Sequence, residues 1–244
     1  MTRIVHVDPT QPLFDAVYTE VLTPSFPPEE RGGLEELRAG VVGGNTSVLA
    51  AVEEDEQPTA VAVGDWSPEI GVVLLSYLAV RSGRRGTGVG GDLLTAAMAD
   101  WRERWRPAIV LAEIEHPSAH VASEEYGDPE KRVRFYARRG MRALDAPYFQ
   151  PGLRPGSPRM YGFMLCTLEV TAEGAGAGPD TVDGARVSRF MTEYLQGCEG
   201  AVGTDPACLA LFAALNRPEG VPLLDAAEYE RVPVSSPDGP ASQV

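Results

Sequence analysis

The chain has 244 residues, with 35 aspartates and glutamates against 21 lysines and arginines, which gives a formal net charge of −14 at pH 7. Such an acidic surface repels nucleic-acid backbones, so we expect no DNA or bulk RNA partner, and it favours cationic small molecules such as amines. We also expect neither a membrane-spanning nor a secreted protein, because the sequence has no apolar run of transmembrane length and no basic segment preceding an apolar one.

Cysteine is scarce. Cys166, Cys198 and Cys208 are too few and too scattered to predict a disulfide framework or a metal site. They are typical of small buried hydrophobic residues in a reducing compartment. We therefore expect a cytoplasmic protein made of one large domain, or of a domain with an appendage, and without a metal.

The N-terminal part predicts one strand followed by two helices. Residues 3–7 alternate like an edge strand, apolar residues recur at helical spacing over 13–22, and a short helix runs from Pro28 to Gly40. Phe26 and Glu30 lie around the break between the helices. Either both residues face a substrate, or Phe26 only packs within the loop and Glu30 is a solvent-exposed charge.

Three strands follow and form an antiparallel meander. Residues 46–52 and 59–63 are joined by the acidic turn 53–58, which predicts a hairpin, and residues 70–80 form the third strand.

A glycine-rich loop, residues 81–91, follows this third strand. It holds four glycines in six residues (Gly86, Gly88, Gly90 and Gly91) and leads into helix-forming sequence over 89–105. A strand, a glycine-rich turn and a helix start together predict an anion site, because the backbone can approach a phosphate and the first N–H groups of the helix point at it. The loop is not a P-loop, since no Lys-Ser/Thr follows the glycines. It is not a dinucleotide site either, since no strand ending in an acidic residue stands about 20 residues later.

Residues 108–116 form an apolar strand that carries two carboxylates. Alternation places Glu113 and Glu115 on one face. Such carboxylates need partners or solvent, so they serve either in proton transfer and ligand binding or as structural hydrogen-bonding groups. His116, on the opposite face, and His120, in the next loop, are weaker candidates for carrying a proton.

The next stretch is a long polar connection that ends at a helix. Asp128 as N-cap and Pro129 at the first position predict a helix that stops at Gly140. The connection offers three candidate site residues: Glu124, Glu125 and Tyr126.

A last hairpin is predicted from residues 141–145 and 160–170, with the proline-rich loop 146–158 between its strands. Three side chains of this loop are candidates for lining a substrate site: Tyr148, Gln150 and Arg154. An arginine there would suit a substrate carboxylate.

The composition shifts after residue 171 to a glycine- and alanine-rich join. We predict domain boundaries at 1–171, 172–234 and 235–244: a main domain, a helical extension and a disordered tail. The extension has two amphipathic helices, whose apolar faces are buried either against the core or against a second subunit. In the second case the protein would be a homodimer.

Two of these stretches resemble the GNAT superfamily of acyl-CoA-dependent N-acyltransferases. Arg85-Gly86-Thr87-Gly88-Val89-Gly90 is similar to its motif A, Arg/Gln-x-x-Gly-x-Gly/Ala. Phe135-Tyr136-x-x-x-Gly140-Met141 resembles its motif B, with methionine where phenylalanine is commoner. The resemblance covers roughly residues 2–170. It implies an α/β fold with a mixed twisted sheet flanked by helices, to which this chain adds a C-terminal helical extension.

The resemblance also implies a function. The loop amides would hold the diphosphate of coenzyme A, and the end of a bulged strand would pair with its pantetheine arm. The implied coenzyme-binding residues are Leu78, Ala79, Val80, Arg85, Gly86, Thr87, Gly88, Val89, Gly90, Gly91 and Tyr136. Tyr136 would protonate the departing thiolate, and Glu113 or Glu115 would take the proton of the attacking amine.

We therefore expect transfer of an acetyl or other short acyl group from acyl-CoA to a primary amine of a small molecule, by direct attack in a ternary complex and without a metal. Acylation of a protein or peptide amine, and a non-catalytic acyl-CoA-binding module, are the alternatives.

Overall fold

The computed structural model describes residues 2–123, 127–153 and 156–240. It divides the chain into two compact units, unit 1 (Met1–Pro107) and unit 2 (Ala108–Val244). The sequence predicts one domain over 1–171, so this division falls inside the predicted domain. Both units combine helices with strands, and the predicted α/β class is confirmed.

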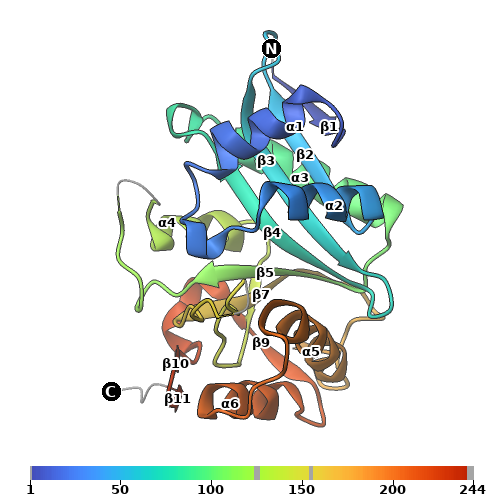
Figure 1. Ribbon diagram of the computed structural model, residues 1–244. Helices are drawn as coiled ribbons and strands as arrows, with labels where there is room; N and C mark the ends of the chain where they lie inside the picture. The colour runs from blue at the N-terminus through green and yellow to red at the C-terminus, as the bar shows by residue number, and fades with distance from the viewer. Residues whose placement is uncertain (1, 124–126, 154–155, 241–244) are drawn as a thin grey trace. The chain divides into compact units, whose positions relative to one another are not determined.

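Unit 1 contains the predicted antiparallel meander. Its strands are β1 (Arg3–His6), β2 (Thr46–Val52), β3 (Pro58–Ser67) and β4 (Val72–Val80), and neighbours in this order pair antiparallel (Figure 1). Every residue of β2 is buried, because it is flanked by strands on both edges and by helices on both faces.

Helices cover both faces of this sheet. The long helix α3 (Val89–Arg104) packs on one face, and α1 (Pro12–Val17) and α2 (Leu34–Gly43) lie on the other, as Figure 1 shows. The helix predicted over 13–22 is α1 continued by a π-helical turn at Tyr18–Leu22, and a 3₁₀ turn at Pro28–Glu30 precedes α2. Phe14 and Val17 of α1 pack with valines of β2 and β3 in the core.

On the opposite face, the fully buried Trp101 ring of α3 lies directly over Gly64 of β3. A Cβ atom at residue 64 would overlap this ring. We expect Gly64→Ala to lower the free energy of unfolding by about 2 kcal/mol, measured by urea denaturation, because a buried tryptophan has no room to retreat. Gly43→Ala is the matched control, since a Cβ at Gly43 meets nothing within 4 Å. Equal denaturation midpoints for the two variants would contradict this close packing.

Unit 2 contains a second set of paired strands. They are β5 (Ile109–Glu115), β7 (Phe163–Val170), β6 (Arg142–Leu144), β9 (Val221–Asp225) and β8 (Thr181–Val182), each antiparallel to the next in this order. The hairpin predicted from 141–145 and 160–170 is therefore present as β6 and β7.

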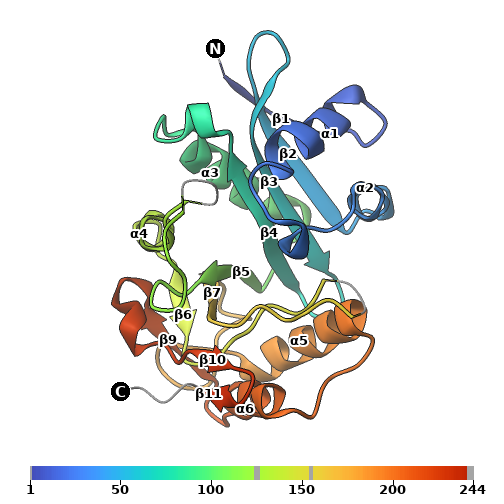
Figure 2. The ribbon, with the colours of Figure 1, turned by 60° about the vertical axis from the view of Figure 1, so that its left-hand side comes forward.

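The C-terminal extension is part of this arrangement. Its two predicted helices are α5 (Gly184–Glu199) and α6 (Pro206–Leu215), which lie side by side (Figure 2). It also contributes β8 and β9, which the sequence does not predict, and β9 pairs with β6 along Arg142–Leu144. The extension thus enlarges the sheet as well as adding helices.

Residues 235–240 form a short hairpin of β10 (Ser235–Ser236) and β11 (Gly239–Pro240). Ser235 is buried, and its hydroxyl donates to the Tyr148 carbonyl and accepts from the Gly162 N–H at 3.2 Å. This stretch differs from the disordered tail that the sequence predicts, because the serine hydroxyl ties it to two other segments. Residues 241–244 lie outside the described residues.

Candidate functional site

The glycine-rich loop of unit 1 joins β4 to α3 through backbone conformations that favour glycine. Gly86 and Gly88 have φ angles of +81° and +91°, which L side chains rarely adopt. The Thr87 hydroxyl donates to the Arg84 carbonyl at 2.8 Å and fixes the turn between them. The loop is exposed up to Gly88, and the chain becomes buried at Gly90.

The loop presents a row of unpaired backbone donors. Within the described chain, the N–H groups of residues 86–90 make no hydrogen bond. The next two N–H groups along the chain, those of Gly91 and Asp92, both donate to the Gly88 carbonyl. These donors stand at the positive end of a 16-residue helix. The arrangement is suited to binding an anion such as a diphosphate.

Three arginines accompany these amides, and they differ in their partners. Arg84 pairs with Glu53, and Arg81 lies 3.5 Å from a Glu20 carboxylate oxygen. Arg85 makes no ion pair with any described residue, and its Nε donates weakly to the Val80 carbonyl at 3.5 Å. The Arg85 guanidinium therefore remains available to a ligand phosphate.

Strand β4, which leads into the loop, carries a bulge. Val63 pairs with Tyr77 and the next residue, Gly64, pairs with Leu75, so Ser76 has no partner in the register. A bulge bends a strand and interrupts its pairing. The bulge that the motif A resemblance implies for this strand is thus present.

Helix α4 (Pro129–Ala137) in unit 2 carries the predicted tyrosine. It begins as the sequence predicts, with the Asp128 carboxylate accepting from the Lys131 N–H at 3.2 Å and proline at the first position. Tyr136 is only 5% exposed, and burial raises the pKa of its phenol well above the usual value of 10, although the Arg132 charge opposes this shift. The phenol is therefore protonated at physiological pH.

The Tyr136 hydroxyl makes no hydrogen bond to any residue in the described part of the chain, which leaves its proton available to a ligand. The ring is held in place by its neighbour. Phe135 meets it edge to face at 4.9 Å, and the Arg139 guanidinium lies 3.9 Å from the Phe135 ring centre.

The Glu113 cluster (Glu113, Tyr148, Gln150 and Tyr194) surrounds the first predicted carboxylate. Glu113 accepts hydrogen bonds from the Tyr148 hydroxyl, the Gln150 amide at 3.1 Å and the Tyr194 hydroxyl at 3.2 Å. Burial raises the pKa of Glu113 above its usual value, and the three hydrogen bonds act against this shift. No cation of the described residues pairs with Glu113, so neutral donors alone hold this carboxylate.

Glu115 has different partners, although it was predicted to share a role with Glu113. Its carboxylate pairs with Arg132 and lies 3.8 Å from the His120 Nδ1. An arginine already balances its charge, which favours the structural alternative for Glu115.

His116 is buried, with both ring nitrogens occupied. Nδ1 accepts from the Ser118 N–H at 3.1 Å, so Nε2 carries the proton and donates to the Tyr229 carbonyl at 2.9 Å. Burial lowers the pKa of His116, which keeps the ring neutral. A histidine bonded in this way is suited to holding loops together rather than to carrying protons.

Comparisons with known proteins bear on the fold. The sequence matches no family model and no curated protein. A solved structure from Bacteroides thetaiotaomicron, assigned to the GNAT family of acetyltransferases, superimposes with a TM-score of 0.55 at 22% sequence identity, covering 79% of this chain and 98% of that one. The chain has the GNAT fold.

Two further GNAT structures are more distant. The ribosomal-protein-S18-alanine N-acetyltransferase from Escherichia coli is 14% identical, with 71% of this chain and 97% of that one covered and a TM-score of 0.48. An acetyltransferase from Elizabethkingia anophelis with acetyl-CoA bound is 13% identical, with 69% and 98% covered and a TM-score of 0.47. The Bacteroides thetaiotaomicron structure confirms, for the fold, the resemblance that the two motifs predict.

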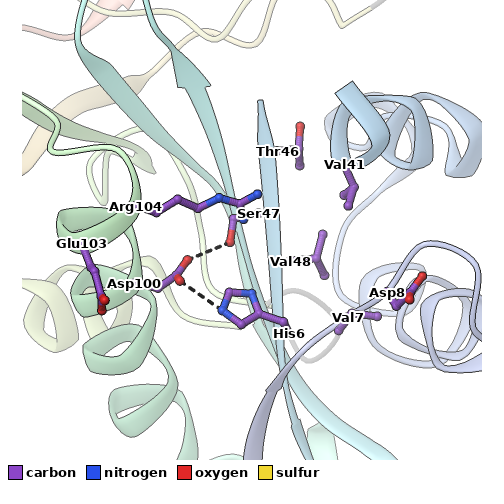
Figure 3. Close-up of a pocket in the computed structure, with 10 residues that line it drawn as sticks. All are labelled: His6, Val7, Asp8, Val41, Thr46, Ser47, Val48, Asp100, Glu103 and Arg104. Carbon is purple, nitrogen blue, oxygen red and sulfur yellow. Dashed lines mark hydrogen bonds and ion pairs between the residues drawn. The ribbon is translucent and has the colours of Figure 1, made fainter. Parts of the chain in front are cut away.

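A surface pocket of about 660 Å³ in unit 1 contains none of the GNAT motif residues. Figure 3 shows Asp100 between His6 and Ser47, with the His6 Nε2 at 3.0 Å and the Ser47 hydroxyl at 3.2 Å. Because the serine donates to the carboxylate and not to the histidine, this trio is no nucleophile–base pair. The pocket is lined by His6, Val7, Asp8, Val41, Thr46, Ser47, Val48, Asp100, Glu103 and Arg104.

The remaining predicted residues fall into two groups. Phe26 is partly buried, packs against the core and meets Tyr77 edge to face at 5.0 Å, which favours the loop-packing alternative. Four candidates lie outside the described residues: Glu124, Glu125, Tyr126 and Arg154. Tyr194 was not predicted as a site residue, since it lies 81 positions from Glu113 and is only one of several large residues on its helix.

Over the described ranges, no group of three or more histidine, cysteine, aspartate or glutamate side chains is arranged to hold a metal ion. None of the helices in those ranges is both long and apolar enough to cross a bilayer. Cys166, Cys198 and Cys208 form no disulfide, and burial raises the pKa of the Cys166 thiol, which makes it unreactive.

Proposed function

We propose that the chain is an acyl-CoA-dependent N-acyltransferase that moves an acetyl or other short acyl group to a primary amine of a small molecule. The observation that carries this proposal is the row of amides at residues 86–90, at the start of α3, which have no hydrogen-bond partner in the described chain and lie beside Arg85, which has no ion pair there. It is supported by the GNAT fold and by the second motif, which supplies a buried tyrosine whose hydroxyl has no partner among the described residues.

The glycine-rich loop would bind the diphosphate of acyl-CoA. Successive N–H groups donate to the phosphate oxygens, the helix dipole adds favourable potential, and Arg85 offers a charged fork. Binding of this kind leaves the thioester free to react, because the loop contacts only the nucleotide end of the coenzyme.

The reaction needs three proton transfers. Glu113 takes a proton from the acceptor's ammonium group, and the amine nitrogen then attacks the thioester carbonyl carbon. The C–N bond forms, the positively charged nitrogen loses its second proton to water, and the tetrahedral intermediate collapses with cleavage of the C–S bond. Tyr136 gives its proton to the departing sulfur and regains one from solvent, and Glu113 releases its proton to solvent, so that the products are a neutral amide and free coenzyme A.

The test is direct. Purified protein is incubated with acetyl-CoA and a panel of primary amines that includes a short peptide, and the release of free thiol is followed. We expect thiol release with at least one small amine. Coenzyme A binding without release from any acceptor would overturn the proposal in favour of a binding module, and release with the peptide alone would overturn the small-molecule part.

The pH dependence should identify Glu113 as the base. Because burial raises its pKa, the carboxylate becomes protonated, and unable to accept a proton, as the pH falls through a value above the usual 4.5. We expect kcat/KM for the amine to fall on this acidic side in the wild type. Glu113→Gln should remove the acidic limb and lower kcat/KM about a hundredfold at neutral pH.

Glu115→Gln is the control, and it should keep the acidic limb because Arg132 balances that carboxylate. An unchanged profile in Glu113→Gln would show that another group takes the proton.

A further inference from the structure

We propose that the C-terminal extension forms part of the acceptor site, where Tyr194 of α5 is a positioning residue for the Glu113 carboxylate that receives the acceptor's ammonium group. This inference rests on the proposed function. It gives a role in acceptor binding to Tyr194, a residue outside the GNAT motifs, and it requires the acceptor to bind as a cation.

Three donors from two separate segments converge on Glu113. Tyr148 donates to Oε1, and Gln150 and Tyr194 both donate to Oε2. A carboxylate can accept about four hydrogen bonds. The three that are present orient it and leave about one direction, on Oε1, for an N–H of the acceptor.

The segment that carries Tyr148 and Gln150 is itself fixed. The backbone groups of Gln150 and Met160 bond to each other at 2.9 and 3.0 Å, and Ser235 holds the Tyr148 carbonyl. The Gln150 side chain is 9% exposed, and its buried Oε1 has no partner among the described residues. Turning the amide over would place this oxygen against the carboxylate, so the donating orientation toward Glu113 is the favourable one.

Helix α5 is fixed to the same segment by ion pairs. Arg159 binds both carboxylate oxygens of Glu199, near the end of α5, at 2.7 and 2.8 Å, and it also reaches Asp205 at 2.8 Å. At the other end, the Asp183 carboxylate caps the helix by accepting from the Arg186 N–H. The Arg159–Glu199 ion pair therefore joins the C-terminal end of the helix that carries Tyr194 to the segment that carries Gln150.

The charge balance of Glu113 points to a cationic ligand. Arginines balance Glu115 and Glu199, but Glu113 has only neutral donors in the described chain. A carboxylate that is removed from water without a counter-ion is costly, and an ammonium group would supply the missing charge. Tyr194 contributes a partly exposed ring next to Phe190 at 5.7 Å, which suits a cation beside aromatic rings.

The test compares Tyr194→Phe with the wild type in the full chain. The variant removes one oxygen and keeps the ring. We expect kcat/KM for the amine to fall about tenfold, the acidic limb of its pH profile to move to higher pH, and KM for acetyl-CoA to stay unchanged. The limb moves upward because Tyr194 stabilises the charged form of Glu113.

Tyr229→Phe is the matched control. This variant also removes a tyrosine hydroxyl that lies near a carboxylate, that of Glu130 at 3.5 Å, but both residues are outside the Glu113 cluster. It should leave kcat/KM for the amine and its pH profile unchanged. A wild-type profile in Tyr194→Phe would overturn the inference while leaving acyl transfer intact.

Calorimetric titration with putrescine and with ethanolamine separates this inference from the proposed function. If the wild type releases no thiol but binds either amine, and Tyr194→Phe binds it about tenfold more weakly, the proposed function fails and the cation site stands. If neither amine binds to the wild type and none releases thiol, both fail.

Discussion

Replacing Tyr136 by phenylalanine is expected to lower kcat for acyl transfer about a thousandfold, the middle of the range for losing a general acid. The pKa of this phenol is raised by burial, so it is a proton donor throughout the physiological range. Without it, the thiolate must leave unprotonated or wait for water. The variant should bind acetyl-CoA with an unchanged Kd, since in the proposed mechanism the hydroxyl acts only in the collapse of the intermediate.

The thermal stability of the Tyr136→Phe variant is the control for this experiment. The Tyr136 hydroxyl has no partner in the described chain, so its removal leaves no other buried group unpaired, and Tm should stay within a degree or two of the wild type. Single-turnover measurement of thiol release then reports on chemistry alone. Retention of wild-type kcat would exclude Tyr136 as the acid.

Gly88→Asp is expected to abolish measurable binding of coenzyme A, with Kd raised about a thousandfold or more. The new carboxylate would face the diphosphate, and two like charges about 4 Å apart repel by about 4 kcal/mol near a protein surface. Aspartate is nevertheless a good residue to place before a helix, and it tolerates the positive φ of this position better than most. The fold should therefore survive the change.

Gly88→Asn is the matched control, because asparagine has the same shape without the charge. We expect Gly88→Asn to weaken coenzyme A binding about tenfold, because a side chain strains the backbone at this positive φ and keeps the loop from approaching the ligand as closely. Both Kd values come from calorimetric titration with coenzyme A. Equal affinities for the two variants would mean that no phosphate lies near this residue.

Features that depend on neighbouring residues could be predicted from the sequence. The start of α4 follows from Asp128 and Pro129, since capping is decided within one helical turn. The exposed amides before α3 follow in the same way from glycines between a strand and a helix. The bulge in β4 was predicted only through the motif A resemblance, because nothing at Ser76 itself indicates an unpaired position.

Features that depend on distant partners could not be predicted. Glu113 and Glu115 look equivalent in the sequence, and they differ because one meets Tyr148 and Tyr194 while the other meets Arg132. Alternation along a strand indicates which residues lie on the same face of the sheet. It does not indicate which partners, such as residues 35 or 81 positions away, the fold places against that face. The same limit applies to β9, a five-residue strand that contains a proline and exists because β6 offers it an edge.

The pairing of β6 with β9 has a consequence for synthesis. The Arg142 guanidinium bonds to the Leu224 carbonyl, 82 positions further on, in the segment where the two strands meet. All strands and helices of unit 1 are complete by residue 104, so this unit can fold while the ribosome is still translating the rest. The strand pairing of unit 2 is complete only once Asp225 has left the exit tunnel, and until then β6 lacks its partner strand β9.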